Sequence, residues 1–475
     1  MASPTPVTPP PYYRRRRSLA GPLVLIIIGV FFLLITSHVI SWPQFGHYFA
    51  RYWPLLLILW GGIRLAEYYT DKQHGYPARG IGAGGVLFLI LLIICGLSAS
   101  TADRLNWQAI QGEIDVDDNF FGGMFGQTFN FNATQQQDLP AGLKDASLRV
   151  LSDRGNVTIK SWDDNRVKVD VTKKIRANDQ NDANQVDQQT QPTINIDANV
   201  ITVNANTSGA GSRGVRTDME IWVPRALALD VATRNGDVII ASRQAGIKLS
   251  TSRGDINVSD ITGNIDIDQK RGDIQISKVT GDVNIQARAD DTTIAEVNGS
   301  VKLNGEYLGG INLSKITKPV TFHSSRTDME FARLDGDFSM DAGDLRANKL
   351  AGPMRVLTRS KDVHLDDFAG DLRVENANST IEVHSTKLGT MEIDNRRGDV
   401  QIFVPDKSTF QADLRARNGE ITSDFDALKV STIRNDASAT GAIGNGGPKL
   451  QVTNEHGNIE IKKAGQAPQP EAGKD

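Results

Sequence analysis

The sequence predicts an all-β solenoid, built from coils of about 18 residues with two short strands each, attached to an N-terminal α-helical membrane region of three spans. A first observation is that glycine, or a residue in its place, recurs every nine residues from Gly236 to Gly299. A second is that Asp or Asn and then an alternating apolar and polar stretch usually follow, as in Asp255-Ile256-Asn257-Val258, which is typical of a turn and a short strand. A third is the presence of three apolar runs before residue 100.

The N-terminal part is predicted to be a disordered basic cytoplasmic segment at 1–18, followed by a membrane region at 19–100. Its spans are expected at about 19–40, 52–68 and 80–99, and a helix crosses a bilayer with about 20 residues. The second run is shorter, so whether it crosses fully stays open. Four arginines at 14–17 keep the N-terminus in the cytoplasm. Three spans then place everything after about residue 100 outside the cytoplasm.

Two stretches of this region resemble a known family. They are Arg-Arg-Ser-Leu-Ala-Gly-Pro-Leu-Val-Leu-Ile at 16–26 and Arg-Tyr-Trp-Pro-Leu-Leu-Leu-Ile-Leu-Trp-Gly at 51–61. Over about residues 14–70 the chain resembles the membrane region of the Lia-type cell-envelope-stress proteins of bacteria. The resemblance implies a multi-pass protein of the bacterial cytoplasmic (inner) membrane, in contact with the lipid bilayer, and it carries over no catalytic residue.

The extracytoplasmic body is predicted at 140–462, between a linker at 101–139 and a disordered tail at 463–475. The residue two before each glycine position alternates between polar and mostly apolar, so one coil has 18 residues and lies about 4.8 Å from the next. Residues 178–191 are expected to form a polar loop, and 193–203 a hairpin. Because solenoid ends expose strand edges, caps are expected at 140–172 and 419–461.

This body also resembles a known family. The residues that carry the likeness are Trp-Asp after Gly-Asn-Val-Thr-Ile at 155–163, the serial Asn/Arg-Gly-Asp strands, and Val-Pro at 404–405. Over about 140–462 the chain resembles the bacterial putative-adhesin β-solenoid family. The resemblance implies surface exposure more strongly than it implies adhesion.

Coil stacking places charged residues in adjacent columns, which form a candidate binding edge. Its members are Arg234, Asp237, Arg253, Asp255, Arg271, Asp273, Arg288 and Asp291. Like charges in one column repel, and the neighbouring column of opposite charge offsets this repulsion. Arg-Gly-Asp at 253–255 and 271–273 is therefore attributed to turn chemistry rather than to integrin-type adhesion. The columns could bind a charged repeating ligand; a solvated edge is the alternative.

No catalytic, cofactor-binding or metal-binding residue is predicted, and the protein is expected not to be an enzyme. The histidines at 323, 364, 384 and 456 are isolated in the sequence and are expected to be surface or turn residues. The net charge of −4, from 52 basic and 56 acidic residues, gives no signal for nucleic acid.

The expected function is adhesion, scaffolding or polymer or protein binding by a membrane-anchored solenoid. Its partner would be a cell-wall or surface polymer or another envelope membrane protein. The alternative, motivated by the Lia-type resemblance, is an envelope-stress sensing or regulatory protein that acts on a membrane partner such as a sensor kinase. A homo-oligomer formed through the spans also stays open.

Overall fold

A computed structural model describes residues 127–140, 146–210 and 214–464, together with a few isolated helical positions between 54 and 93. The chain divides into two compact units, 1–125 and 126–475. The predicted basic N-terminus, nearly all of the three predicted spans and most of the C-terminal tail lie outside the described residues. Among the positions that are described, no helix has the length and apolar character needed to cross a bilayer.

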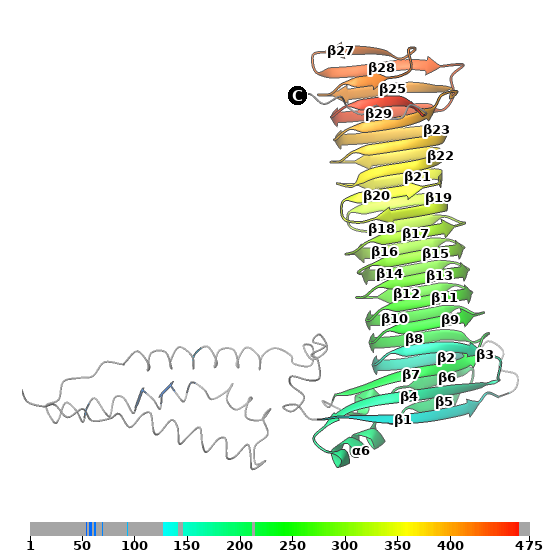
Figure 1. Cartoon of the computed structure of the whole chain (residues 1–475), viewed down its shortest axis with the longest axis vertical. Coiled ribbons are helices and arrows are strands. Elements are labelled where there is room, and N and C mark those ends of the chain that lie inside the picture. The colour runs from blue at the N-terminus through cyan, green and yellow to red at the C-terminus, as the bar shows by residue number, and fades with distance from the viewer. Residues whose placement is uncertain are drawn as a thin grey trace, which may run out of the picture. The chain divides into compact units, whose positions relative to one another are not determined.

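The described part of the second unit is a β-solenoid. Its thirty strands hydrogen-bond into one continuous sheet, and Figure 1 shows them stacked as a single column. In the regular part each strand pairs in parallel with the second strand after it, 18 residues later up to β16, so that Ile247 lies opposite Ile265 and Ile256 opposite Ile274. The pairs of β15 with β17 and of β16 with β18 are 19 residues apart. This register confirms the predicted coil of two strands. The regular strands are β8 (Ala228–Asn235), β9 (Val238–Arg243), β10 (Ile247–Arg253), β11 (Ile256–Thr262), β12 (Ile265–Gln269), β13 (Ile274–Thr280), β14 (Val283–Ala289), β15 (Thr292–Asn298), β16 (Val301–Tyr307), β17 (Ile311–Ile316) and β18 (Val320–His323).

The regular strands form two rows with the core between them. Even-numbered strands from β8 to β18 pair with one another, and odd-numbered strands from β9 to β17 do the same. Alternate side chains point to opposite faces of a strand, so Ile256 and Val258 are buried while Asn257 is exposed. The apolar residues of this alternating pattern are at most 3% exposed: Val238, Ile240, Ile256, Val258, Ile265, Ile267, Ile274, Ile276, Val283, Ile285, Val301 and Leu303. Burial of each such side chain contributes about 1.5–3 kcal/mol.

The regular stacking is interrupted once and then resumes. The strands involved are β19 (Thr327–Met340), β20 (Asp344–Asn348), β21 (Leu350–Thr358), β22 (Asp362–Asn376) and β23 (Ile381–Arg397). β19 runs antiparallel to β17, β18, β20 and β21, and β22 restores parallel pairing. The long strands β19, β22 and β23 pass from one row to the other. The row that ends in β18 therefore continues through β19, β21, β22 and β23.

The first and last coils of the body lie inside the stack rather than at its ends. The end strands are β2 (Ser147–Arg154), β3 (Val157–Trp162), β6 (Val200–Asn204), β7 (Val215–Pro224), β24 (Val400–Pro405), β25 (Phe410–Arg417), β26 (Ile421–Ser423), β29 (Lys449–His456) and β30 (Ile459–Ala464). β2 lies between β6 and β8, and β3 between β7 and β9. At the other end β29 lies between β23 and β25, and β30 between β24 and β26. We call these inserted coils, 147–162 and 449–464, the interlocked coils.

The interlocked coils lie largely within the predicted caps at 140–172 and 419–461. For these coils the prediction was wrong, because each coil has a neighbouring coil on both sides. The N-terminal end is instead covered by β1 (Gln127–Asp138), β4 (Arg166–Ala177), β5 (Thr193–Asp197) and the helix α6 (Gln180–Gln189). β4 runs antiparallel between β1 and β7, and β5 forms the predicted hairpin with β6. At the other end the hairpin of β27 (Lys429–Ile433) and β28 (Asp436–Ile443) pairs with β25.

Two segments of the N-terminal cover differ from expectation. The last part of the predicted linker, 101–139, is the strand β1, where Phe129 and Phe131 pack against a buried cluster beneath α6. The predicted polar loop at 178–191 is α6, because the Asp179 carboxylate caps the helix by accepting a hydrogen bond from the Asp182 amide at 2.8 Å. Ala183 and Val186 form its buried face.

Arg243 is an interior cation in an otherwise apolar column. It lies opposite Ile261 in the register of β9 and β11 and is 1% exposed. Its guanidinium donates to the hydroxyl of Ser161 at 3.1 Å and to the carbonyl of Val223 at 3.3 Å. Burial, and secondarily the charge of Arg225, lowers the pKa of Arg243 to about 10.

Candidate functional site

The acidic column of the predicted binding edge is a hydrogen-bonded ladder. The carboxylate of Asp237 accepts from the backbone amide of Asp255 at 3.0 Å, and that of Asp255 accepts from the amide of Asp273 at 2.9 Å. The ladder continues through Asp291 to the amide of Gly310, at 3.0 and 2.6 Å. Each Asp therefore joins one coil to the next, which explains why Asp follows the turn glycine.

We expect Asp255→Ala to lower the free energy of unfolding by about 0.5–1 kcal/mol, because the amide of Asp273 loses its acceptor at a solvent-exposed site. Asp255→Asn keeps an acceptor oxygen and is expected to have a smaller effect. Thermal unfolding of both variants, followed by circular dichroism, tests this. An equal loss in the two variants would show that the charge, which both remove, rather than the acceptor oxygen, which only Asn keeps, is what the ladder needs.

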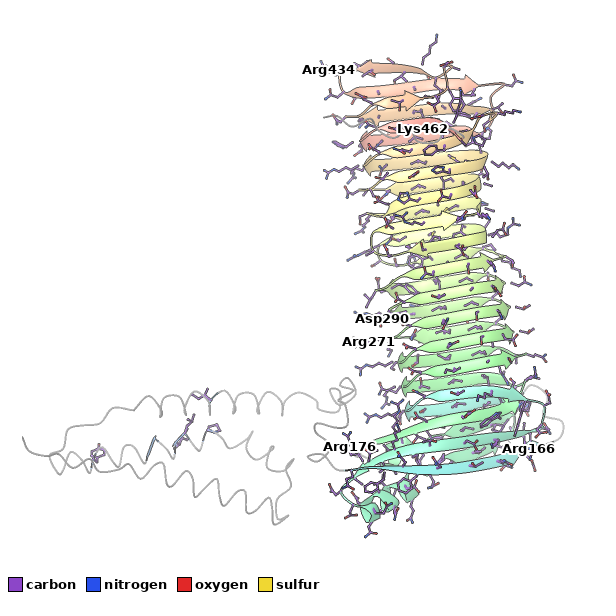
Figure 2. The ribbon with its side chains drawn as sticks, viewed as in Figure 1. Arg166, Arg176, Arg271, Asp290, Arg434 and Lys462 are labelled. Carbon is purple, nitrogen blue, oxygen red and sulfur yellow. The ribbon has the colours of Figure 1, made fainter. Side chains whose placement is uncertain are left out.

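The basic residues of the predicted edge do not form one continuous column. Arg253 and Arg271 lie at successive turns, and both make interactions with neighbouring groups. Arg234 pairs with Asp153 at 3.4 Å, whereas Arg288 lies opposite Glu306 in the register of β14 and β16. Figure 2 shows Arg271 at the same edge of the column as Asp290. The structure thus brings the acidic members together and splits the basic ones.

Further along the same edge the surface hollows into a groove of about 570 Å³. We call it the edge groove. It is lined by residues at the ends of β19, β21, β22, β23 and β29, which continue the row that holds Arg253 and Arg271. Its charged lining residues are Arg326, Asp328, Arg359, Glu375, Asp394, Arg396 and Glu455.

Three of the four carboxylates in the edge groove contact a basic side chain, and the fourth, Asp394, is hydrogen-bonded by the Thr453 side chain. Asp328 contacts the Nδ1 atom of His323. Glu375 accepts from Arg373 at 2.9 Å, and Glu455 lies 3.5 Å from the Nε atom of Arg396. For the fourth, burial, and secondarily the charge of Glu392, raises the pKa of Asp394. The groove is therefore less acidic than its composition suggests.

Two arginines lie side by side at one end of the edge groove. Thr327 lies opposite Thr358 in the antiparallel register, so Arg326 and Arg359 are adjacent, and both are exposed. Within the described part of the chain neither forms an ion pair with a carboxylate. Lys361 adds a third positive charge, and burial lowers its pKa, with Arg326 acting in the same direction. This end of the groove is suited to an anionic group.

Sequence reasoning missed the edge groove because one of its walls, at 324–328, lies where the nine-residue period is interrupted. Two of the histidines that are isolated in the sequence share one carboxylate in the structure. His364 Nδ1 lies 3.2 Å from Glu382 Oε2, and His384 Nε2 lies 2.8 Å from Glu382 Oε1. His384 also stacks on Phe403, with 4.0 Å between ring centroids. The signal was available, because His364 and Glu382 are 18 residues apart, the length of one coil.

Comparisons with known proteins gave two similar solved structures and one family. No curated protein matches the chain. It is similar to the crystal structure of a putative cell adhesion protein from Clostridium sporogenes ATCC 15579, with 9% identity, a TM-score of 0.17, and coverage of 70% of this chain and 100% of that one. It is also similar to a putative adhesin (BF0245) from Bacteroides fragilis NCTC 9343, with 12% identity, a TM-score of 0.17, and coverage of 70% and 97%. At such low values, the two structures say nothing about what this chain binds.

The sequence model of one family matches residues 146–462, which is more than half of the chain. That family is described as Toastrack DUF4097. The match supports the predicted β-solenoid family over nearly the same residues, while the Lia-type resemblance of the N-terminal part stays a prediction. The chain belongs to the Toastrack DUF4097 family.

Proposed function

We propose that this protein is a membrane-anchored cell-envelope protein whose extracytoplasmic solenoid binds a charged cell-wall or surface polymer, in an adhesive or scaffolding role. The observation that carries the proposal is the edge groove with its adjacent arginines, Arg326 and Arg359. The membrane anchor is supported by the three apolar runs and by the four arginines that precede them.

The dimensions of the edge groove suit an extended ligand. Five neighbouring strand ends line it, and at about 4.8 Å per strand they span about 19 Å. Polar side chains and backbone line most of this length. Guanidinium groups can each donate two parallel hydrogen bonds to a carboxylate, sulfate or phosphate. A polymer with regularly spaced anionic groups would place one group at the arginine pair and its neighbours further along the groove.

The double variant Arg326→Ala/Arg359→Ala is expected to weaken binding of a polyanion by at least about tenfold, because two charge-assisted contacts are lost. The probe is dextran sulfate, with neutral dextran as the reference ligand, followed by surface plasmon resonance at two salt concentrations. The affinity of the parent should fall as salt rises, and that of the variant should fall less.

Two further variants separate the edge groove from general surface charge. Arg166→Ala removes an arginine at the opposite edge of the column, where Arg166 pairs with Asp164, and it should leave binding unchanged. Arg253→Ala/Arg271→Ala tests the originally predicted edge. Equal losses in the groove variant and in Arg166→Ala would contradict a defined site.

The regulatory alternative predicts that the N-terminal membrane region, rather than the solenoid, binds a membrane partner such as a sensor kinase. In-cell crosslinking of the full chain and of a chain that ends at residue 125, where the first compact unit ends, distinguishes the two. Capture of a membrane regulator by the shorter chain alone would favour envelope-stress regulation. Capture of cell-wall material that requires residues 126–475 would favour the proposed binding role.

A further inference from the structure

A cluster of metal-ligating side chains lies on the other row of the solenoid, at the beginnings of two strands rather than at the strand ends that line the edge groove. Its members are Asp344 on β20 and Asp362 and His364 on β22, and one candidate ligand atom from each lies within 4.8 Å of the others. Asp344 is opposite Asp362 in the parallel register, while Asp362 and His364 are two residues apart and so project from the same face. All three side chains are half-buried.

The two carboxylates of this cluster are only weakly compensated by nearby cations. Arg346 approaches Asp344 at 3.5 Å, an exposed contact of the kind that contributes little. The amino group of Lys361, the residue before Asp362, donates to the carbonyl of Asp341. One oxygen of Asp362 accepts from the Thr380 amide at 2.8 Å. The second oxygen of Asp362 forms no hydrogen bond within the described part of the chain.

The orientation of the His364 ring is a separate observation that points to a metal. Its Nδ1 atom is held by Glu382 at 3.2 Å, so the proton belongs on Nδ1 and the lone pair on Nε2. The other oxygen of Glu382 lies 2.8 Å from the Nε2 atom of His384, and His384 is itself stacked on Phe403. A histidine that ligates a metal almost always has a carboxylate or carbonyl on its other nitrogen.

We propose that Asp344, Asp362 and His364 bind one divalent transition-metal ion, with Glu382 as a positioning residue. Imidazole nitrogen together with carboxylate oxygen suits Zn²⁺, whereas Ca²⁺ and Mg²⁺ prefer oxygen ligands alone. Three protein ligands leave one tetrahedral position for water or an external group. The ion would join β20 to β22, where parallel stacking resumes, and the proposal is independent of the edge groove.

Titration of the full chain with Zn²⁺ against a chromophoric chelator tests the site. At the zinc concentration that just saturates the parent protein, the parent is expected to bind one equivalent more than His364→Ala or Asp344→Asn. Each of these variants is expected to bind zinc at this site at least about tenfold more weakly. His323→Ala is the matched control, because His323 also contacts an aspartate, Asp328, but on the other row. It should bind as many equivalents as the parent.

The role of Glu382 needs a readout that folding alone would not change. With Co²⁺ in place of Zn²⁺, Glu382→Gln is expected to shift the visible absorption bands and to weaken binding about tenfold, while its circular dichroism matches that of the parent. Equal zinc stoichiometry in the parent, His364→Ala and Asp344→Asn would overturn the site. An unchanged cobalt spectrum in Glu382→Gln would overturn the positioning role.

Discussion

Gly254→Ala is expected to lower the free energy of unfolding by about 3 kcal/mol or more. Gly254 has φ +126°, and a Cβ atom at this position would lie 2.2 Å from the carbonyl oxygen of Gly236 in the preceding coil. A side chain therefore meets an unfavourable backbone conformation, which costs about 1–3 kcal/mol, as well as a clash with backbone that cannot move away. Chemical denaturation of the variant, monitored by circular dichroism, measures the loss.

The matched control is Gly246→Ala, a neighbouring glycine outside the left-handed region. A Cβ atom there would meet the carbonyl oxygen of Asn264 at 3.6 Å, an ordinary contact. Its effect should stay within about 0.5 kcal/mol. Equal effects at the two glycines would mean that stacking of the turns does not limit stability.

Lys173→Met is expected to destabilise the N-terminal cover by about 3 kcal/mol. Lys173 is 1% exposed, forms an ion pair with Asp187 of α6, and donates to the carbonyls of Asp187 and Thr190 at 3.1 and 3.3 Å. Removing one partner of a buried pair leaves the other charge uncompensated. Hydrogen exchange should show faster exchange in α6 and β1, while the central coils keep their protection.

Two comparisons isolate the ion pair of Lys173 and Asp187. Lys174→Met changes the next residue along the strand, whose side chain is exposed, and should leave exchange in α6 unchanged. Lys173→Met/Asp187→Leu removes both charges and should recover part of the lost protection. If the double variant is less stable than Lys173→Met, the pair does not act through its charges.

The regular part of the fold could be predicted because the repeat length in the sequence sets the pairing register of neighbouring coils. A residue 18 positions later lies one coil further on, so the buried positions and the ladder from Asp237 to Asp291 follow directly from the spacing. The same rule would have placed Asp344 beside Asp362 and His364 beside Glu382. Those pairs are not apparent from the local sequence, because their members are 18 residues apart.

The other features could not be predicted because they depend on contacts that have no period. The edge groove forms where β19 reverses direction, and the interlocked coils depend on pairing across long intervening segments, as between β3 and β7. α6 has only two buried side chains, Ala183 and Val186, so its apolar pattern is weak. Its capping residue, Asp179, lies in a stretch rich in Asn, Asp and Gln, a composition that is typical of a loop.

The interlocked coils have a mechanical consequence. In a simple stack the terminal coil has one neighbour, and a pulling force on the chain end can peel it off by breaking one ladder at a time. Here the last coil has a neighbour on each side, since β30 bonds to both β24 and β26. Tension applied at the C-terminal end of the described chain must therefore break two strand ladders at once before the last coil, 449–464, can unravel.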